Sequence, residues 1–151
     1  MGDRLVIVVP GRISGKQRAG RRRLRGGKIL SFNPAKTKAE EDRVQYYAIE
    51  ALRQQHFARL LFGPISVAIV ITQTPPESWS KRRQANTRWI TGKPDVDNVI
   101  KLILDALRVI WSDDSQVAQI TLQRTYGLHN GVEIVVEQLQ HAERTQQQES
   151  A

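Results

Sequence analysis

The sequence predicts a single α/β (α+β) domain in which a mixed sheet packs against two helices. Three observations support this fold class. Short β-branched runs and segments of helical periodicity follow in the order β-α-β-α-β-β. The chain has 151 residues, the size of one domain, and 40% are hydrophobic, enough for a core. The domain is expected to span residues 1–140, and the polar residues 141–151 to form a disordered tail.

The first half of the chain predicts a strand, a basic loop and a helix. Residues 5–9 are apolar and β-branched, which is typical of a strand. Residues 12–37 lack periodicity and are interpreted as a long basic loop. Thr37 and Glu40 have the spacing of a capping box, so we expect a helix from there to about residue 55.

The second half predicts a strand, a helix and a β-hairpin. Within residues 65–72, large apolar side chains recur at every second position, which is typical of a half-buried strand, and a polar loop, 73–93, follows. After Pro94, apolar residues recur every three or four positions, which predicts an amphipathic helix. Residues 116–126 and 132–139 read as two strands joined by a glycine-containing connection, so we expect them to pair.

Charge is strongly positive and unevenly placed. The net charge is +8, and the stretch from Arg4 to Ala39 holds eleven Lys and Arg residues without one Asp or Glu. Such a block favours a polyanionic partner, because each cation that meets a phosphate releases condensed counterions.

There are no cysteines, which excludes disulfides, thiolate zinc sites and cysteine nucleophiles. No apolar run has the length of a membrane span, so a cytoplasmic protein without membrane contact is expected.

Two aspartates stand at the entrance of the second predicted helix. Asp95 follows a proline and precedes the apolar stripe, the usual place of an N-cap with extended backbone. Asp97 lies two residues further, and Lys101 lies four residues beyond Asp97 on the same side of the helix. Taken alone, these three residues are explained by a structural role, in which the carboxylates cap the helix and Lys101 forms an i, i+4 ion pair.

A second acidic pair, Asp113 and Asp114, favours a functional role for these residues over a purely structural one. Two acidic clusters are costly in a protein that binds polyanions unless a cation neutralises them. Mg²⁺ prefers hard oxygen ligands and usually takes few carboxylates together with waters and substrate phosphate. Acidic groups inside a positive surface are therefore suited to metal-assisted phosphodiester cleavage. An EF-hand is excluded, because Ile100 and Ala106 stand where its glycine and glutamate are needed.

The chain resembles the RusA family of crossover-junction endodeoxyribonucleases, small dimeric resolvases common in phages and prophages. The resemblance spans most of the chain, and its specific part is one block of the sequence. This block reads Pro94-Asp95-x-Asp97-Asn98-x-x-Lys101-x-x-x-Asp105-Ala106-Leu107, followed by Trp111-x-Asp113-Asp114-x-Gln116-Val117.

The resemblance implies a metal-dependent nuclease that acts as a homodimer on branched DNA, the Holliday junction. It implies that Asp95, Asp97 and Asp114 bind Mg²⁺, for which Mn²⁺ could substitute, that Lys101 assists catalysis, and that Asp113 has a supporting role. DNA contacts are expected from the first basic loop, the polar loop and the segment entering the helix: Ser14, Gly15, Lys16, Arg18, Arg21, Arg22, Arg23, Lys81, Arg82, Arg83, Lys93 and Asn98.

The reach of the chain leaves two arrangements open for Asp114. A helix from Asp97 to Arg108 rises roughly 16 Å at ~1.5 Å per residue. The six steps from Arg108 to Asp114 span at most about 20 Å. Within one subunit, Asp114 thus reaches the helix entrance only if the connecting chain is almost fully extended. The alternative is that Asp114 completes the partner's site. We prefer the same subunit slightly.

Two other functions remain open at this stage. A basic module without catalysis, its carboxylates serving as caps, would bind nucleic acid and show no Mg²⁺-dependent cleavage. A metal-dependent nuclease acting on flaps or other branched DNA would share the chemistry and differ only in substrate.

Asp105 is expected to form an ion pair with Lys101 or Arg108, and Trp111 to anchor the end of the helix.

Overall fold

The computed structural model describes residues 4–15, 20–32, 34–56 and 61–140. Its main elements have the predicted order, with one hairpin and one short helix added. Lys16, Arg18 and the tail 141–151 lie outside the described residues. The elements are β1 (Arg4–Pro10), β2 (Gly20–Arg23), β3 (Ile29–Phe32), α1 (Ala35–Gln54), β4 (Ile65–Gln73), α2 (Lys81–Asn86), α3 (Val96–Ala106), η1 (Leu107–Val109), η2 (Asp114–Gln116), β5 (Val117–Tyr126) and β6 (Gly131–Gln138).

The main sheet is mixed and has the strand order β1-β6-β4-β5. β6 pairs antiparallel with both β1 and β4, and β5 pairs parallel with β4. The predicted pairing of β5 with β6 is therefore wrong. The cause is burial: Val132, Ile134 and Val136 make β6 the better central strand, whereas the more polar β5 tolerates the edge.

The connection between β5 and β6 crosses the end of β4. The N–H of Gly127 donates to the carbonyl of Gln73, and the N–H of Thr74 donates to the side-chain oxygen of Asn130. A Cβ at Gly127 would lie 2.6 Å from Cγ2 of Thr72. Glycine is required there because the connection passes so closely over β4.

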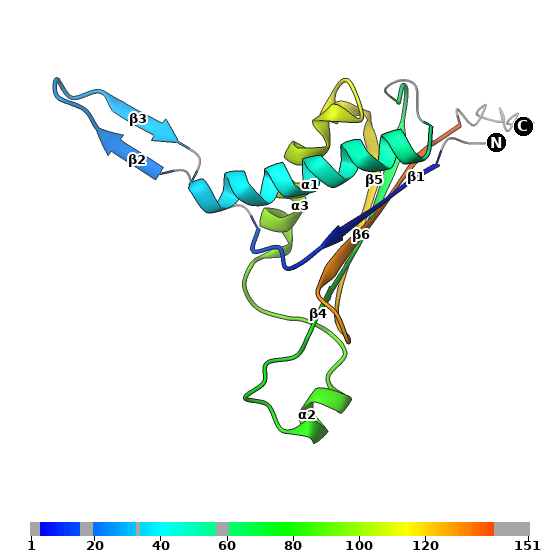
Figure 1. Ribbon diagram of the computed structural model, residues 1–151. Coiled ribbons are helices and arrows are strands. Elements are labelled where there is room, and N and C mark those ends of the chain that lie inside the picture. The colour runs from blue at the N-terminus through cyan, green and yellow to red at the C-terminus, as the bar shows by residue number, and fades with distance from the viewer. Residues whose placement is uncertain (1–3, 16–19, 33, 57–60, 141–151) are drawn as a thin grey trace, which may run out of the picture.

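Both long helices cover the same face of the sheet (Figure 1). β4 turns Ile65, Val67, Ile69 and Ile71 to this face, the predicted alternation, and each is at most 1% exposed. Trp111 is 1% exposed at the end of the α3–η1 segment, as expected of an anchor. Burying side chains of this size contributes roughly 1.5–3 kcal/mol each, so this face holds the fold together.

The predicted capping box at the start of α1 is not formed. The helix begins at Ala35 with Pro34 as its N-cap residue, and no side chain caps it. Thr37 is buried inside the helix, and the Glu40 carboxylate accepts the N–H of Ser14 instead. Glu40 thus makes a long-range contact with Ser14 in place of the local capping box that the sequence pattern predicted.

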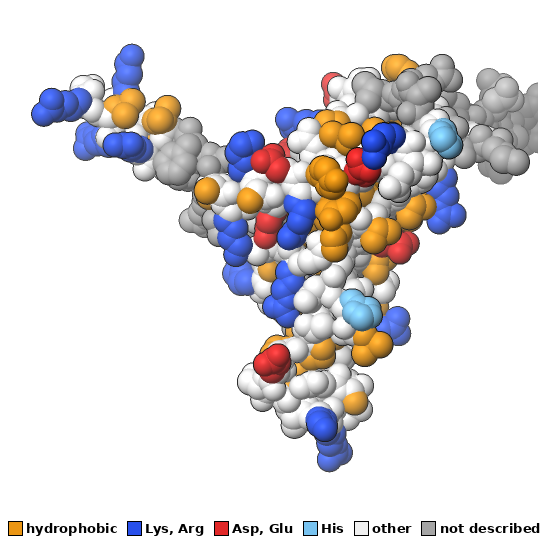
Figure 2. Space-filling view, viewed as in Figure 1, with side chains coloured by type: hydrophobic (Ala, Val, Ile, Leu, Met, Phe, Trp, Pro, Cys, Tyr) orange, Lys and Arg blue, Asp and Glu red, His pale blue; other side chains and the backbone are white. Residues whose placement is uncertain are grey.

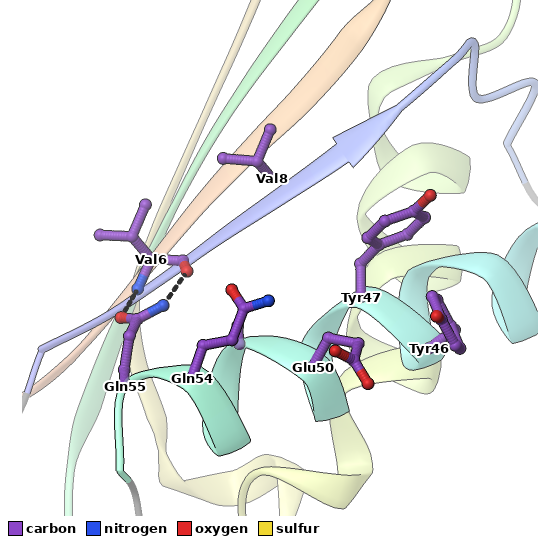
Figure 3. A pocket seen from close by; sticks show the side chains of 8 residues that line it. Val6, Val8, Tyr46, Tyr47, Glu50, Gln54 and Gln55 are labelled. Atoms are coloured by element: carbon purple, nitrogen blue, oxygen red, sulfur yellow. Dashed lines mark hydrogen bonds between the residues drawn. The ribbon is translucent and has the colours of Figure 1, made fainter.

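A side chain protects the free edge of β1. The amide oxygen of Gln55 accepts the N–H of Val6 at 3.0 Å, and the amide nitrogen of Gln55 donates to the Val6 carbonyl at 2.7 Å (Figure 3). The amide thereby takes the place of a neighbouring strand. Beside it lies an open hollow of about 550 Å³ between α1 and β1, to which Val8 and Tyr46 contribute. None of the predicted site residues lines this hollow.

Two basic segments predicted as loops contain regular structure. Within 12–37, β2 and β3 form a two-stranded hairpin that stands away from the body (Figure 1). Its turn contains Gly26 and Gly27, both at positive φ, a conformation that favours glycine. Within 73–93, α2 forms a short helix whose N-cap, Ser80, accepts the N–H of Arg83.

Candidate active site

The candidate site is built around the first turn of α3. Asp95 is its N-cap residue, with the extended backbone predicted for that position. The backbone carbonyl of Asp95 accepts the N–H groups of Asn98 and Val99, but its side chain makes no capping hydrogen bond. The carboxylate instead lies 2.8 Å from the ammonium of Lys93. Because it caps no backbone group, this carboxylate is available to another ligand.

Asp97 and Lys101 complete the exposed side of this first turn. Asp97 lies in the first turn of α3 and Lys101 four residues later, so both lie on the same side. Both are exposed, and neither forms an ion pair with another residue in the described part of the chain. Two carboxylates and the ammonium groups of Lys93 and Lys101 therefore share a solvent-accessible helix entrance.

The segment after β1 lies directly against this entrance. A Cβ at Gly15 would lie 3.0 Å from Cβ of Pro94 and 3.4 Å from Cγ2 of Val99, and Gly15 has a φ of +79°. The neighbouring N–H of Ser14 donates to both carboxylate oxygens of Glu40, at 2.9 and 3.0 Å. Glu40 is only 8% exposed, so α1 holds this segment firmly beside Pro94.

Glu40 is one of the positioning residues that sequence reasoning missed. Its spacing from Thr37 suggested a helix cap, which hid a contact to a residue 26 positions away. The guanidinium of Arg43, on the same helix, donates to the carbonyl of Arg12 and adds a second tether. α1 thus anchors the predicted DNA-contact residues Ser14 and Gly15 from behind.

Arg124 is the second missed residue, and it holds the chain that enters α3. Its guanidinium donates to the carbonyl of Pro94 at 2.7 Å and approaches that of Gly92 at 3.4–3.5 Å. The backbone N–H of Ile90 donates to the carbonyl of Arg124 as well. One signal could have revealed it: Arg124 continues the alternation of Ile120 and Leu122, which pack against the core.

Asp114 lies at the other end of α3. Its carboxylate accepts the indole N–H of Trp111 at 2.9 Å and the guanidinium of Arg108 at 3.1 Å. Arg108 also pairs with Asp105 at 3.0 Å. Of the two partners predicted for Asp105, Lys101 and Arg108, the structure thus shows Arg108. The helix from Val96 to Ala106 rises roughly 16 Å, and η1 continues beyond it.

The three aspartates therefore do not meet within one subunit, whereas the sequence slightly favoured a site within the same subunit. Among the described residues there is no group of three or more His, Cys, Asp or Glu side chains that could hold a metal ion. The reason is local: Arg108 and Trp111 bind the Asp114 carboxylate beside the end of the helix. Asp95 and Asp97 remain together at the entrance.

Asp113 has a structural environment. Its carboxylate accepts the N–H of Ser115 at 2.8 Å, while the side-chain oxygen of Gln116 accepts the N–H groups of Asp113 and Ser112, forming a capping box for η2. The hydrogen bonds from Ser115 hold the pKa of Asp113 below its ordinary value. Asp113 thus fixes the turn that presents Asp114.

Comparison with known proteins identifies the family. The sequence model described as "Endodeoxyribonuclease RusA" matches residues 10–137, most of the chain. The chain belongs to the RusA family. The resemblance noted from the 93–117 block is confirmed, and with it an endodeoxyribonuclease, a hydrolase acting on DNA. A relative from Bacillus subtilis (strain 168), "Uncharacterized protein YqaN", is 31% identical over 123 residues, which cover 77% of this chain and 84% of the relative.

Two projections of this RusA-family chain, the β2–β3 hairpin and the segment that contains α2, each carry a cluster of exposed basic residues. Figure 2 shows Lys and Arg side chains on the β2–β3 hairpin and on the lower projection. These projections carry Arg21, Arg22 and Arg23 on β2, and Lys81, Arg82 and Arg83 in α2. Lys93 is exposed beside Asp95, and Asn98 is half-buried. No helix in the described ranges has the length and apolar character needed to cross a bilayer.

The donor groups at the entrance of α3 fit a magnesium ion in chemistry. Asp95 and Asp97 supply exposed, hard carboxylate oxygens, and Mg²⁺ is commonly held by one or two carboxylates, with water and phosphate completing its shell. Asp114 would have to come from elsewhere to join them. The arrangement thus suits a cation shared between the protein and a DNA phosphate.

Proposed function

We propose that this chain is a Mg²⁺-dependent endonuclease that resolves four-way DNA junctions by paired nicking as a homodimer. One observation carries the proposal: Asp95, Asp97 and Lys101 are exposed together at a helix entrance beside the anchored residues Ser14 and Gly15. In a protein of net charge +8 that binds a polyanion, acidic groups at such a place repel the DNA phosphates unless a cation joins them. The RusA family membership supports the same chemistry.

In this proposal Asp95 and Asp97 hold Mg²⁺, or Mn²⁺ as a substitute. A bound metal ion would supply charge neutralisation at the phosphate and an acidified water. Lys101 donates a hydrogen bond to a phosphate oxygen and stabilises the charge that develops there. Lys93, which pairs with Asp95 in the free protein, turns to a DNA phosphate when Asp95 binds the metal.

Asp114 completes the site from the second subunit in this proposal. Its distance along α3 from Asp95 and Asp97, and its fixed orientation against Arg108 and Trp111, support sharing between subunits. Oδ1 of Asp114 keeps a free lone pair after accepting the indole N–H, whereas Oδ2 faces both Nε and Nη2 of Arg108, so Oδ1 leaves room for a metal. A two-fold dimer would then carry two sites, one for each of two opposed strands of a junction.

A cleavage assay on synthetic DNA tests the proposal. A labelled four-way junction is incubated with the protein in Mg²⁺, in Mn²⁺ and in EDTA, beside a flap and a linear duplex of the same sequence. We expect symmetric nicks in two opposed strands of the junction with either metal and none in EDTA. Equal cleavage of the flap, or cleavage of the junction in EDTA, would contradict the junction specificity or the metal requirement respectively.

Asp97→Asn provides the matched variant. It keeps the size of the side chain and removes the charge that binds a cation. We expect it to lose nicking while it binds the junction as tightly as the unaltered protein or more tightly. Full cleavage by this variant would remove Asp97 from the active site.

A further inference from the structure

The β2–β3 hairpin, residues 20–32, is the most isolated part of the described chain and is called the arm below. It extends from the N-terminal end of α1 away from the sheet (Figure 1). Its strands pair only with each other, with Arg22 opposite Leu30 and Arg23 opposite Ile29. A hairpin of two four-residue strands has no interior in which to bury side chains. What the arm exposes is therefore available to a partner.

The arm is strongly cationic. It carries five Lys and Arg residues and no Asp or Glu. All five are exposed, and no ion pair within the described ranges includes any of them. They are Arg21, Arg22, Arg23, Arg25 and Lys28. Such a segment is complementary to a polyanion.

The arm also exposes aliphatic side chains among these cations. Leu24 is 41% exposed, Ile29 is 65% exposed and Leu30 is 50% exposed. Directly opposite residues of an antiparallel pair lie on the same face, so Leu30 lies beside Arg22 and Ile29 beside Arg23. Figure 2 shows hydrophobic side chains next to Lys and Arg along this projection. A surface that needed only phosphate contacts would have no use for these apolar groups.

We infer that the arm is a wedge for the branch point of the DNA substrate. Its cations bind the phosphates that flank the branch, and Leu24, Ile29 and Leu30 contact base faces that lose their stacking there. Apolar side chains flanked by basic ones are used in this way where proteins kink or open DNA. The inference rests on the proposed function, because it assumes branched DNA as the substrate.

Charge favours DNA over a second copy of the chain as the occupant. Two arms packed against each other would bring ten Lys and Arg residues together without an acidic residue from either arm. Like charges at that density repel, whereas a junction offers phosphates and exposed bases at one place. Association through the arms is the outcome that the test must separate.

The test uses the full chain and a four-way junction with 2-aminopurine at the branch, in EDTA so that no strand is cut. Fluorescence of 2-aminopurine rises when its base unstacks. Three variants are compared: an apolar variant (Leu24→Ser, Ile29→Ser and Leu30→Ser together), a charge variant (Arg21→Gln, Arg22→Gln and Arg23→Gln together), and a control, Leu128→Ser, at an 88% exposed leucine outside the arm.

We expect the unaltered protein and the control to raise the fluorescence several-fold. The apolar variant should lose most of that rise, with junction affinity weakened by less than about five-fold, since it keeps every phosphate contact. The charge variant should lower the salt dependence of binding, the slope of log K against log salt, by up to about three.

Three results would overturn the inference. In the first, the apolar variant retains the fluorescence rise. In the second, the unaltered protein binds the junction without any rise. In the third, the apolar variant sediments as a smaller species than the unaltered protein, which would assign the arm to subunit association. Failure of the proposed function looks different: the unaltered protein would then show no preference for the junction over duplex DNA.

Discussion

The guanidinium of Arg124 donates a 2.7 Å hydrogen bond to the backbone carbonyl of Pro94, the residue immediately before Asp95. Arg124 belongs to the edge strand β5, whereas Asp95 begins α3, so this contact joins the sheet to the candidate site. Together with Glu40, which holds Ser14 from α1, it fixes the site from two sides. The following predictions test these contacts and the proposed chemistry.

Arg124→Gln is expected to slow junction cleavage on the order of 10²-fold, because displacement of reacting groups by about 1 Å can have that effect. The Mg²⁺ concentration needed for half-maximal single-turnover cleavage should rise as well, since Asp95 would be held less firmly. Arg124→Lys should recover part of the rate. Arg4→Gln, which removes an exposed ion pair with Glu137, is the control and should change neither quantity. An unchanged metal dependence in Arg124→Gln would reduce Arg124 to a residue of general stability.

Glu40→Gln is expected to lower the free energy of unfolding by about 1.5–3 kcal/mol, since it removes the charge from buried hydrogen bonds to the Ser14 N–H. Urea unfolding measures this change. Glu50→Gln, which breaks only the ion pair with Arg53 on the same helix, should cost less than about 0.5 kcal/mol. If both variants lose the same stability, the anchoring role of Glu40 is wrong.

Lys101→Met is expected to reduce the rate of cleavage on the order of 10²–10³-fold, the usual loss when a donor to the transition state is removed. Its junction affinity should change little, because one phosphate contact among many is lost. Lys101→Arg should retain more activity than Lys101→Met. Single-turnover rates and titration of junction binding in EDTA separate the two effects. A loss confined to affinity would contradict a catalytic role.

Mixing Asp97→Asn and Asp114→Asn chains tests whether the subunits share a site. Each variant is expected to be inactive by itself. In a heterodimer, the site that combines the intact Asp97 of one chain with the intact Asp114 of the other is complete, so nicking of one strand per junction should return. Co-expressed chains with different affinity tags provide the pure heterodimer. No recovery would show that each subunit gathers its own three aspartates through a rearrangement.

Asp113→Ala is expected to destabilise the protein at neutral pH by removing the cap of η2. The pKa of Asp113 is lowered in the folded state by the hydrogen bonds from Ser115, so its contribution is present above the unfolded value of about 3.9. That contribution is lost as the pH falls through the lowered pKa. The difference between Asp113→Ala and the unaltered protein should therefore vanish at the acid end of a denaturation series. A difference that stays constant over this range would exclude the ionised cap.

Several elements were predictable from local patterns. Periodicity predicted α3 and the alternation of β4, and the proline before Asp95 marked the start of the helix. The arm was missed because a four-residue strand is too short to establish a period, although Gly26 and Gly27 mark its turn. The pairing of β6 was missed because adjacent strands in sequence usually pair, and here a burial preference places β4 between them.

By itself the sequence determined the type of fold, the family, the positive charge of the arm and the presence of two carboxylates at one helix entrance. These follow from residue identity and from interactions within a few turns or strand positions. Only the tertiary structure decided that Arg124 and Glu40 hold the entrance, across 30 and 26 residues, and that Asp114 lies at the far end of α3. The physical reason is that hydrogen-bond partners and strand neighbours at such separations depend on how the whole core packs, which no local pattern encodes.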